Sequence, residues 1–326
     1  MASSPTKVNL VSSQIYTWFS TLRPRLYPYK PLIIGINGLQ GSGKTTLTTA
    51  LIKTLSSPPY SLKIATLSTD DLYLTHSDQL RLAAANPTNP LLEFRGNPGT
   101  HDVDLGAETL SRILTAQTEA TISQTPTSIP LPAYDKSLNN GRGDRLPQSF
   151  WLCAPIPLDI LLFEGCYLGF KPISSTALTT LLHSSSQQPP QTSTTVTLGP
   201  HHLTSHTLQN LQTLLQNLTP YTQKWYPHIS AFIHITAEDP SWVYYWRWEQ
   251  ELSLKSRLNN PDAGLSHQQV IDFVNRFAPM YVMCLPTLTE KGFFADENGE
   301  VPEEFEGRHL QVVLDKDREV VESRLI

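Results

Sequence analysis

Apolar residues in the first 70 positions follow a helical pattern and then two short strand patterns. Helical spacing over Val8–Leu22 predicts an amphipathic helix whose apolar face carries Val8, Val11, Ile15, Trp18, Phe19 and Leu22. The β-branched run Leu32–Ile36 predicts a buried strand, Thr45–Leu55 a helix and Leu62–Leu67 a second strand. This order indicates an α/β fold with a doubly wound, mainly parallel sheet flanked by helices.

The rest of the chain alternates between the same two patterns. Further helices are predicted over Thr75–Ala85, Leu105–Leu114, Thr207–Leu218, Ser241–Leu258 and His267–Phe277, the last being the final helix. Further strands are predicted over Ile160–Phe163, Ile229–Ile235, His309–Leu314 and Glu319–Ser323, and a Thr/Ser/Pro loop over Thr121–Pro132. We therefore expect an N-terminal helical extension over residues 1–30 and one domain over residues 31–326.

One long stretch carries no charge. Charged residues make up 16% of the chain, against about 25% in an average soluble domain. Much of the deficit lies between Lys171 and Lys224, where no Asp, Glu, Lys or Arg occurs. The first part, from Ser174 to about Pro200, is rich in Ser, Thr, Gln and Pro, which predicts no secondary structure. We expect a mobile surface insert around residues 174–200.

Composition excludes several classes of protein. No apolar run approaches the ~20 residues that a membrane span needs. Cys153, Cys166 and Cys284 have no CxxC spacing, so neither a disulfide framework nor a zinc site is indicated. Seven Lys and Arg residues, and no Asp or Glu, precede Asp70, which fits an anion-binding region. Nucleic acid is not expected as a partner, because no basic cluster with interleaved aromatic residues appears.

Residues 38–45 match the phosphate-loop pattern G-x-x-x-x-G-K-[ST]. In such a loop backbone N–H groups converge on phosphate oxygens, the lysine (Lys44) reaches the β- and γ-phosphates, and the hydroxyl of Thr45 binds Mg²⁺. The alternative is a glycine turn that only joins two elements, but the match lies between a predicted strand and a predicted helix. We expect a nucleoside triphosphate to be bound by Gly38, Gln40, Gly41, Ser42, Gly43, Lys44, Thr45 and Thr46.

Carboxylates follow two of the predicted strands. Asp70 and Asp71 come after the second strand, and Glu164 ends the strand Ile160–Phe163. Because the carboxyl ends of parallel strands face the ligand crevice, these groups are candidates for a general base and for Mg²⁺ ligands. Thr45, Asp70 and Glu164 are the predicted metal ligands. The alternatives are helix capping for Asp71 and an ion pair with Lys or Arg for Glu164.

Seven motifs occur in a fixed order along the chain. They are the phosphate loop, Asp70–Tyr73, Arg95–Asp102, Tyr134–Ser137, Gly141–Arg145, Phe163–Gly165 and Trp246–Glu251. Together they resemble the plant and fungal D-glycerate 3-kinases and their fungal ATP-binding relatives, within the phosphoribulokinase, uridine kinase and pantothenate kinase superfamily. The resemblance runs from about Pro31 to Pro286. It implies a P-loop NTPase/kinase fold with a helical lid.

The resemblance also implies roles for single residues. Asp70 takes the place of the catalytic aspartate, with Lys44 and the lid residue Arg247 as the other catalytic groups. The implied substrate residues are Asp71, Tyr73, Arg95, His101, Asp102, Tyr134, Lys136, Arg142 and Arg145. Arg142 and Arg145 would bind an acidic acceptor, since a guanidinium group pairs with a carboxylate through two hydrogen bonds. A structural role for His101 is an equal alternative.

The activity implied by the resemblance is transfer of the γ-phosphoryl group of ATP, with Mg²⁺, to D-glycerate, giving 3-phospho-D-glycerate. Two alternatives stay open: a kinase for another small acceptor, and an ATP-binding protein without metabolic turnover. The expected partners are ATP and a small anionic hydroxy acid, with no nucleic acid and no membrane. A cytoplasmic location is preferred to an organellar one, because only Met1–Lys7 precedes the first predicted helix.

Overall fold

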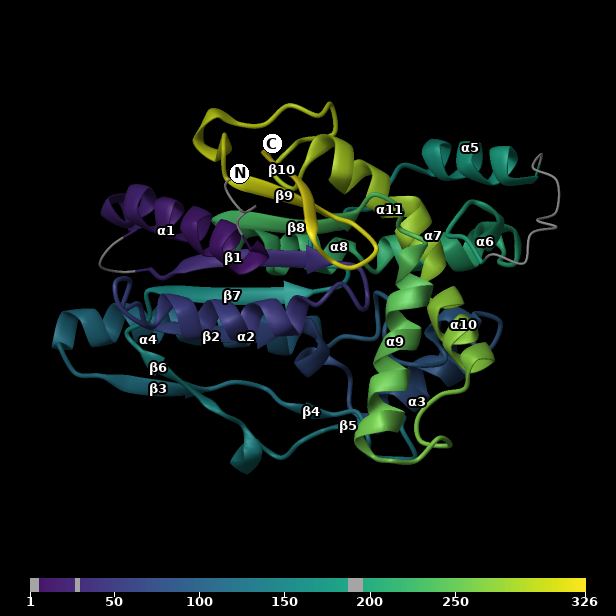
Figure 1. The fold of residues 1–326 in the computed structure, drawn as a ribbon, viewed down its shortest axis with the longest axis horizontal. Coiled ribbons are helices and arrows are strands. Elements are labelled where there is room, and N and C mark those ends of the chain that lie inside the picture. The colour runs from purple at the N-terminus through teal and green to yellow at the C-terminus, as the bar shows by residue number, and fades with distance from the viewer. Residues whose placement is uncertain (1–5, 27–29, 187–195) are drawn as a thin grey trace.

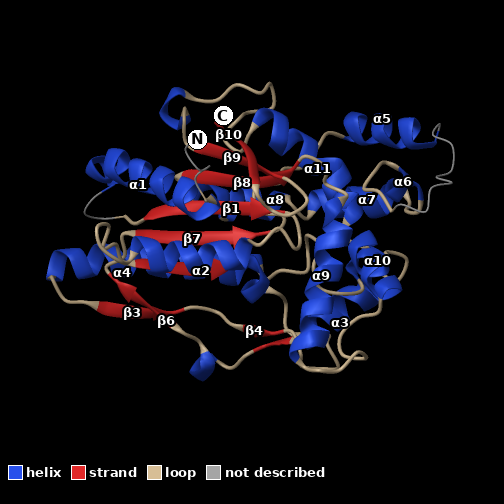
Figure 2. Cartoon of the chain, viewed as in Figure 1, coloured by secondary structure: helices blue, strands red, loops and turns tan. Residues whose placement is uncertain are grey.

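A six-stranded sheet forms the centre of the protein (Figure 2). The computed structural model describes residues 6–26, 30–186 and 196–326. The strand order is β10-β9-β8-β1-β7-β2. The strands are β1 (Leu32–Gly38), β2 (Ile64–Ser68), β7 (Ile160–Gly165), β8 (Ala231–Ala237), β9 (His309–Leu314) and β10 (Val320–Leu325). Only β10 is antiparallel to its neighbour. The predicted α/β fold with a mainly parallel sheet is confirmed.

The register aligns the carboxyl ends of the central strands. Ile36 of β1 and Ser68 of β2 both lie opposite Glu164 of β7. The loops that follow these strands therefore start side by side at one edge of the sheet, where a parallel fold places its ligands.

Two small antiparallel sheets of two strands each lie outside the central sheet. One pairs β3 (Thr127–Pro130) with β6 (Cys153–Ile156), and the other pairs β4 (Tyr134–Asp135) with β5 (Asp144–Arg145). The β4–β5 pair is a hairpin that brings Tyr134 opposite Arg145. It lies on the side of the molecule where the strands of the central sheet end (Figure 1).

Most of the helices lie in the connections between strands of the sheet. They are α1 (Lys7–Leu26), α2 (Lys44–Leu55), α3 (His76–Ala85), α4 (Val103–Ser123), α5 (Ser175–Ser186), α6 (His201–Thr204), α7 (Leu208–Gln216), α8 (Thr219–Lys224), α9 (Trp242–Arg257), α10 (His267–Asn275) and α11 (Ala278–Lys291). A 3₁₀ turn, η1 (Thr69–Leu72), follows β2 directly. In the part of the chain that the structure describes, no helix is long and apolar enough to cross a membrane.

Helices cover both faces of the sheet. α1 and α2 lie side by side on one face, and α4 and α8 lie on the other (Figure 1). A Cβ added to Gly106 of α4 would lie 2.6 Å from Nε1 of Trp225, so a small residue is needed at this contact. The Trp225 ring in turn meets Phe163 of β7 at 5.4 Å between centroids. This packing fixes α4, and with it the loop that precedes α4, against the sheet.

The N-terminal extension is part of the core. Val11, Ile15 and Trp18 of α1 are buried in the same apolar cluster as the central strands. The indole N–H of Trp18 also donates to the carbonyl oxygen of Gly307 at 2.8 Å. The helix predicted over Val8–Leu22 is confirmed, and its apolar face packs as its spacing indicates.

Two predictions about polar segments are wrong. Within Ser174–Pro200, helix α5 spans Ser175–Ser186, whereas composition predicts no secondary structure. Leu178 of this helix is fully buried, and the hydroxyls of Thr179 and Thr180 donate to carbonyls four residues earlier, so uncharged residues suffice for the helix. Residues 187–195 lie outside the described residues, and mobility of the insert stays a prediction. Thr121–Pro132 is likewise no loop, because α4 continues to Ser123 and β3 follows it.

A further helix escapes the sequence pattern. His267–Phe277 is not the final helix, since α11 follows it. Pro279 and Pro286 mask the periodicity, because proline is usually a helix breaker. Here Pro279 stands in the first turn, where a helix tolerates proline, and Pro286 lies inside the helix. The helix is stabilised by its buried face, which includes Met280, Tyr281 and Leu288.

Truncation of a buried α1 side chain tests whether the extension stabilises the domain. Trp18→Ala removes a side chain that is 3% exposed together with its hydrogen bond, and should lower the free energy of unfolding by about 3–5 kcal/mol. Tyr16→Ala on the same helix, where Tyr16 is 41% exposed, is the control and should cost far less. Urea denaturation measures both values. Equal, small effects would show that α1 is a dispensable attachment.

Candidate active site

The phosphate loop joins β1 to α2 at the carboxyl ends of the parallel strands, which we call the carboxyl edge of the sheet. Gly41 and Gly43 have φ angles of 77° and 86°, in the left-handed region that favours glycine. The ammonium group of Lys44 donates to the carbonyl oxygens of Gly38 at 2.7 Å and Leu39 at 3.2 Å. A lysine has three N–H donors, so one remains for a phosphate oxygen.

Helix α9, which the resemblance predicts to act as a lid, packs directly on this loop. A Cβ added to Gly41 would lie 2.6 Å from Cβ of Trp246 and 3.0 Å from its backbone carbon. Gly41 is therefore required both by its backbone conformation and by the closeness of α9. The contact places Arg247, the next residue of α9, near the loop; its guanidinium pairs with Glu251 and lies over the Phe273 ring.

The turn between β9 and β10 also holds the phosphate loop. Nε of Arg318 donates to the carbonyl oxygen of Gly41 at 2.7 Å, and Nη1 pairs with Glu249 of α9 at 2.7 Å. Lys7 of α1 donates to the carbonyl oxygen of Arg318 at 3.1 Å. Sequence reasoning missed Lys7 and Arg318. The pattern predicts the turn itself, but no local signal links it to a loop some 270 residues away.

Asp70 lies in η1, at the end of β2. Its carboxylate accepts the phenolic O–H of Tyr73 at 2.9 Å and pairs with the ammonium group of Lys136 at 2.5 Å. Burial opposes ionisation, but the charge and hydrogen bond of Lys136 and the hydrogen bond of Tyr73 outweigh it and hold the pKa of Asp70 at about 2. Asp70 is therefore ionised at neutral pH.

Glu164 ends β7 beside Asp70. The hydroxyl of Ser68 donates to its Oε1 at 2.7 Å and also accepts the N–H of Asp70 at 3.2 Å, which joins the two acidic residues. Burial raises the pKa of Glu164, while the positive charge of Lys44 acts in the opposite direction. The structure thus brings together Lys44, Asp70 and Glu164.

These residues suit a magnesium ion better than a transition metal. Among the described residues, no three His, Cys, Asp or Glu side chains form a metal-binding group. Mg²⁺ needs only one or two carboxylates beside phosphate and water oxygens. Both oxygens of Asp70 already accept hydrogen bonds, whereas Glu164 accepts one at Oε1, so Glu164 and the Thr45 hydroxyl fit the ion best. The metal ligands stay a prediction.

Asp71 faces the β4–β5 hairpin. Its Oδ1 accepts the backbone N–H of Tyr134 at 3.2 Å. Burial raises the pKa of Asp71 to about 6, opposed by the Tyr134 N–H and reinforced by the negative charge of Asp70. The predicted substrate residues Asp71, Tyr73, Tyr134 and Lys136 therefore lie around Asp70.

His101 is part of the packing behind Tyr73. It is 6% exposed, its ring stacks on Tyr73 at 4.5 Å between centroids, and its Nδ1 lies 2.7 Å from the hydroxyl of Tyr221. Burial lowers the pKa of His101 to about 4, with the charge of Asp70 acting against this shift. The ring is thus neutral at pH 7 and supports Tyr73; a contact between His101 and an acceptor stays a prediction.

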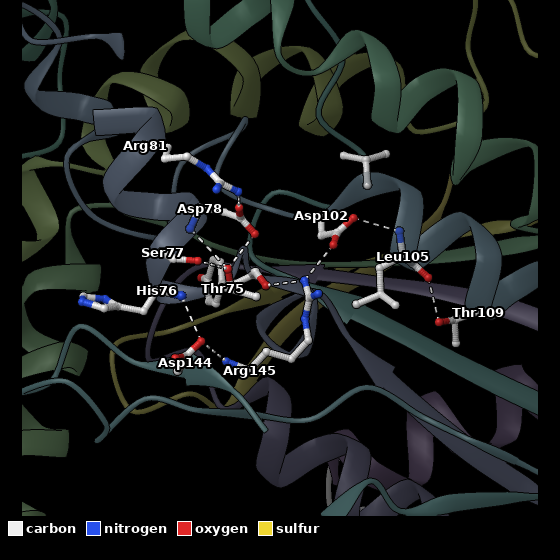
Figure 3. A network of polar contacts seen from close by, with 12 residues as sticks. Thr75, His76, Ser77, Asp78, Arg81, Asp102, Leu105, Thr109, Asp144 and Arg145 are labelled. Carbon is white, nitrogen blue, oxygen red and sulfur yellow. Dashed lines mark hydrogen bonds and ion pairs between the residues drawn. The ribbon is translucent and has the colours of Figure 1, made fainter. Parts of the chain in front are cut away.

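Arg145 and Asp102 pair with each other (Figure 3). The 2.8 Å ion pair joins the β5 strand to the N-terminus of α4, where Oδ1 of Asp102 accepts the N–H of Leu105. Arg145 also donates to the carbonyl oxygen of Tyr73 at 3.0 Å. These contacts fix the hairpin beside η1 and α4. Arg145 already has its carboxylate, so a role in binding an acidic acceptor stays a prediction.

Arg142 lies in the turn of the same hairpin, and Arg95 contacts that turn from outside the hairpin. Arg95 donates to the carbonyl oxygens of Gly141 and Arg142, and its guanidinium lies 5.8 Å from the Tyr134 ring. Arg142 pairs with Glu93 at 3.7 Å and stacks on Phe94. Arg95 thus holds the hairpin closed, while Arg142 lies over the loop that precedes α4.

A phosphate loop after β1, with Asp70 and Glu164 at the ends of β2 and β7, defines a P-loop nucleotide-binding protein. No protein-family model matches the chain. It is 36% identical over 263 residues to the uncharacterized kinase mug58 of Schizosaccharomyces pombe, covering 80% of this chain and 84% of that protein. It is 35% identical over 291 residues to the chloroplastic D-glycerate 3-kinase of Arabidopsis thaliana, covering 88% of this chain.

The chain spans 53% of the length of the plant protein. Its fold matches the solved structure of D-glycerate 3-kinase from Cryptococcus neoformans with a TM-score of 0.82 and 28% identity, over 99% of this chain and 100% of that one. The chain therefore belongs to the family of P-loop kinases that includes mug58 and the D-glycerate 3-kinases.

Substitution of Gly41 tests the contact between α9 and the phosphate loop. Gly41→Ala should weaken ATP binding about tenfold or more, a change of ~1.4 kcal/mol, because its Cβ would displace the loop or the helix. Gly307→Ala is the control, since Gly307 has a φ of 69° but no atom within 4 Å of an added Cβ. It should lower stability by about 1–2 kcal/mol and leave ATP binding unchanged. Calorimetric titration with ATP distinguishes the two; equal affinities would contradict the role of Gly41.

The pKa of Asp71 makes stability depend on pH. An unfolded Asp titrates near 3.9, so between pH 4 and pH 6 the folded chain binds more protons and stability falls as pH rises. Asp71→Asn keeps the acceptor for Tyr134 and removes the titration. The free energy of unfolding of Asp71→Asn minus that of the unmodified protein should increase by about 1–3 kcal/mol from pH 4 to pH 7. Urea denaturation at both pH values measures the change, and a difference independent of pH would refute it.

Proposed function

We propose that the protein transfers the γ-phosphoryl group of ATP to a hydroxyl of D-glycerate, giving 3-phospho-D-glycerate. The observation that carries the proposal is the grouping of Lys44, Asp70 and Lys136 at the carboxyl edge of the sheet, on a chain related to two proteins named D-glycerate 3-kinase. Phosphoryl transfer needs mainly positioning and charge neutralisation, and this edge offers both.

We assign Lys44 to the nucleotide and Asp70 to the acceptor. Lys44 and the backbone N–H groups of the loop bind the β- and γ-phosphates. Mg²⁺, when bound by Thr45 and Glu164, neutralises charge on these phosphates. The cavity beside Gly41 and Thr46, about 670 Å³ in volume and bordered by Val8, Leu254 and Arg318, is the place for the ribose and base.

Asp70 is the group that receives the acceptor hydroxyl. With a pKa of about 2 it is a weak base, and it acts chiefly by orienting the hydroxyl and taking its proton late in the transfer. Lys136 holds the carboxylate ionised, and Tyr73 fixes the orientation of Oδ1. Arg247 would add positive charge on the phosphoryl group if it leaves its present partner Glu251.

Two other functions compete with this proposal. Another small acceptor would use the same phosphate loop and the same Asp70. An ATP-binding protein without turnover would keep the loop but release no ADP in response to an acceptor. Purified protein with Mg-ATP should therefore be tested on D-glycerate, pantothenate, uridine and ribulose 5-phosphate. We expect turnover with D-glycerate. ADP release only with another acceptor would select the first alternative, and no ADP release with any acceptor would select the second.

A cytoplasmic location stays a prediction.

Loss of the Asp70 charge tests its role. Asp70→Asn keeps the size of the side chain but cannot take the proton, and should lower kcat about 10²- to 10⁴-fold with little change in the KM for ATP. Asp104→Asn, at an 82% exposed carboxylate paired with Lys224, is the matched control and should leave kcat unchanged. Steady-state kinetics measure both variants; full turnover by Asp70→Asn would exclude Asp70 as the base.

A further inference from the structure

Arg276, directly after α10, has no polar partner for its side chain. Its guanidinium carbon lies 4.6 Å from the ring centroid of Phe94 and 5.2 Å from that of Phe273. In the part of the chain that the structure describes, no hydrogen bond or ion pair reaches this guanidinium. None of its nitrogens is among the buried atoms that lack a partner, so they are accessible to a ligand.

The backbone around Arg276 is fixed. Nδ2 of Asn97 donates to the carbonyl oxygen of Arg276 at 3.0 Å, and the hydroxyl of Tyr167 donates to that of Phe277 at 3.2 Å. The two phenylalanine rings hold the side chain from the loop before α4 and from α10. The guanidinium is therefore positioned before any ligand binds, which lowers the entropy cost of binding.

The other arginines around these rings already have acceptors. Arg142 shares Phe94 and pairs with Glu93, and Arg247 shares Phe273 and pairs with Glu251. Arg95 donates to backbone carbonyls of the hairpin. Arg276 is thus the member of this group that is left without a carboxylate. Burial lowers its pKa and the charge of Arg95 adds to the effect, while the charges of Glu93 and Asp272 oppose it; the net shift is downward, so a bound anion would offset the cost of burying the charge.

Arg95 and Lys136 connect Arg276 to Asp70. Arg95, whose charge Arg276 feels, donates to the carbonyl oxygen of Lys136, and Lys136 pairs with Asp70. The phosphates of the nucleotide have their own cation in Lys44. We therefore assign an anion at Arg276 to the molecule whose hydroxyl meets Asp70.

We propose that the guanidinium group of Arg276 binds the carboxylate of the acceptor and so selects a hydroxy acid over an uncharged alcohol. The interaction consists of two parallel N–H···O hydrogen bonds between the planar groups, with no bond broken. This inference rests on the proposed function, because it takes D-glycerate as the acceptor. No role was predicted for Arg276 from the sequence.

Substitution of Arg276 tests the proposal through the two Michaelis constants. Arg276→Met keeps an apolar side chain between Phe94 and Phe273, and should raise the KM for D-glycerate about 10- to 100-fold. The KM for ATP and kcat should stay within about twofold of the unmodified values, because the contact is equal in the ground and transition states. Arg276→Lys keeps the charge but loses the planar pair of N–H donors. Its KM for D-glycerate should lie between that of the unmodified protein and that of Arg276→Met.

Arg308→Met is the matched control. Arg308 also lies over a phenylalanine ring, 5.2 Å from Phe305. It precedes β9, at the amino ends of the parallel strands and so away from the phosphate loop. Its substitution should leave both KM values unchanged. Calorimetric titration of D-glycerate into the unmodified protein and Arg276→Met measures binding directly, and thermal unfolding of each variant shows that it is folded.

Each other outcome has a distinct meaning. An unmodified protein that phosphorylates D-glycerate, with a KM that Arg276→Met leaves unchanged, overturns this inference and keeps the proposed function. A fall in kcat at unchanged KM for D-glycerate places Arg276 on the phosphoryl group and also overturns it. An unmodified protein that neither binds nor phosphorylates D-glycerate overturns the proposed function, and the inference with it.

Discussion

The balance of charge at the carboxyl edge of the sheet is the constraint on which the site depends. Parallel strands bring Asp70 and Glu164 to neighbouring positions, where two partly buried carboxylates repel each other and resist ionisation. Lys136 and Lys44 supply the opposing charge from the β4–β5 hairpin and the phosphate loop. The ion pair between Lys136 and Asp70 therefore attaches the short β4–β5 hairpin to the central sheet, in addition to its packing.

The two ends of the chain complete the structure around the phosphate loop. Lys7 near the N-terminus binds the turn that carries Arg318 near the C-terminus, and Arg318 binds both Gly41 and α9. The indole N–H of Trp246 also donates to the carbonyl oxygen of Lys316 in that turn at 2.7 Å. A movement of α9 would therefore shift the phosphate loop and the turn together, which couples this helix to the phosphate loop.

The sequence predicts those parts of the fold and site that local patterns determine. Most strands of the central sheet are short apolar runs, and the phosphate loop has a fixed glycine spacing, so both are found where predicted. Helix α11 is missed because Pro279 and Pro286 hide its period, and α5 because a Ser/Thr-rich composition conceals the buried Leu178. Arg276 carries no local signal, since its environment is made by Phe94, which lies far away in the sequence. The pairing of Arg145 with Asp102 is equally a product of the tertiary fold.

The central claim is that a nucleotide and an acidic acceptor meet at this edge of the sheet, between the phosphate loop and Arg276. A crystal structure of the protein with Mg²⁺, a non-hydrolysable ATP analogue and D-glycerate tests it most directly. The account predicts phosphates in the loop of residues 38–45, a glycerate hydroxyl within hydrogen-bonding distance of Asp70, and the glycerate carboxylate on Arg276. Glycerate bound at the opposite edge of the sheet, or with its carboxylate turned away from Arg276, would contradict it.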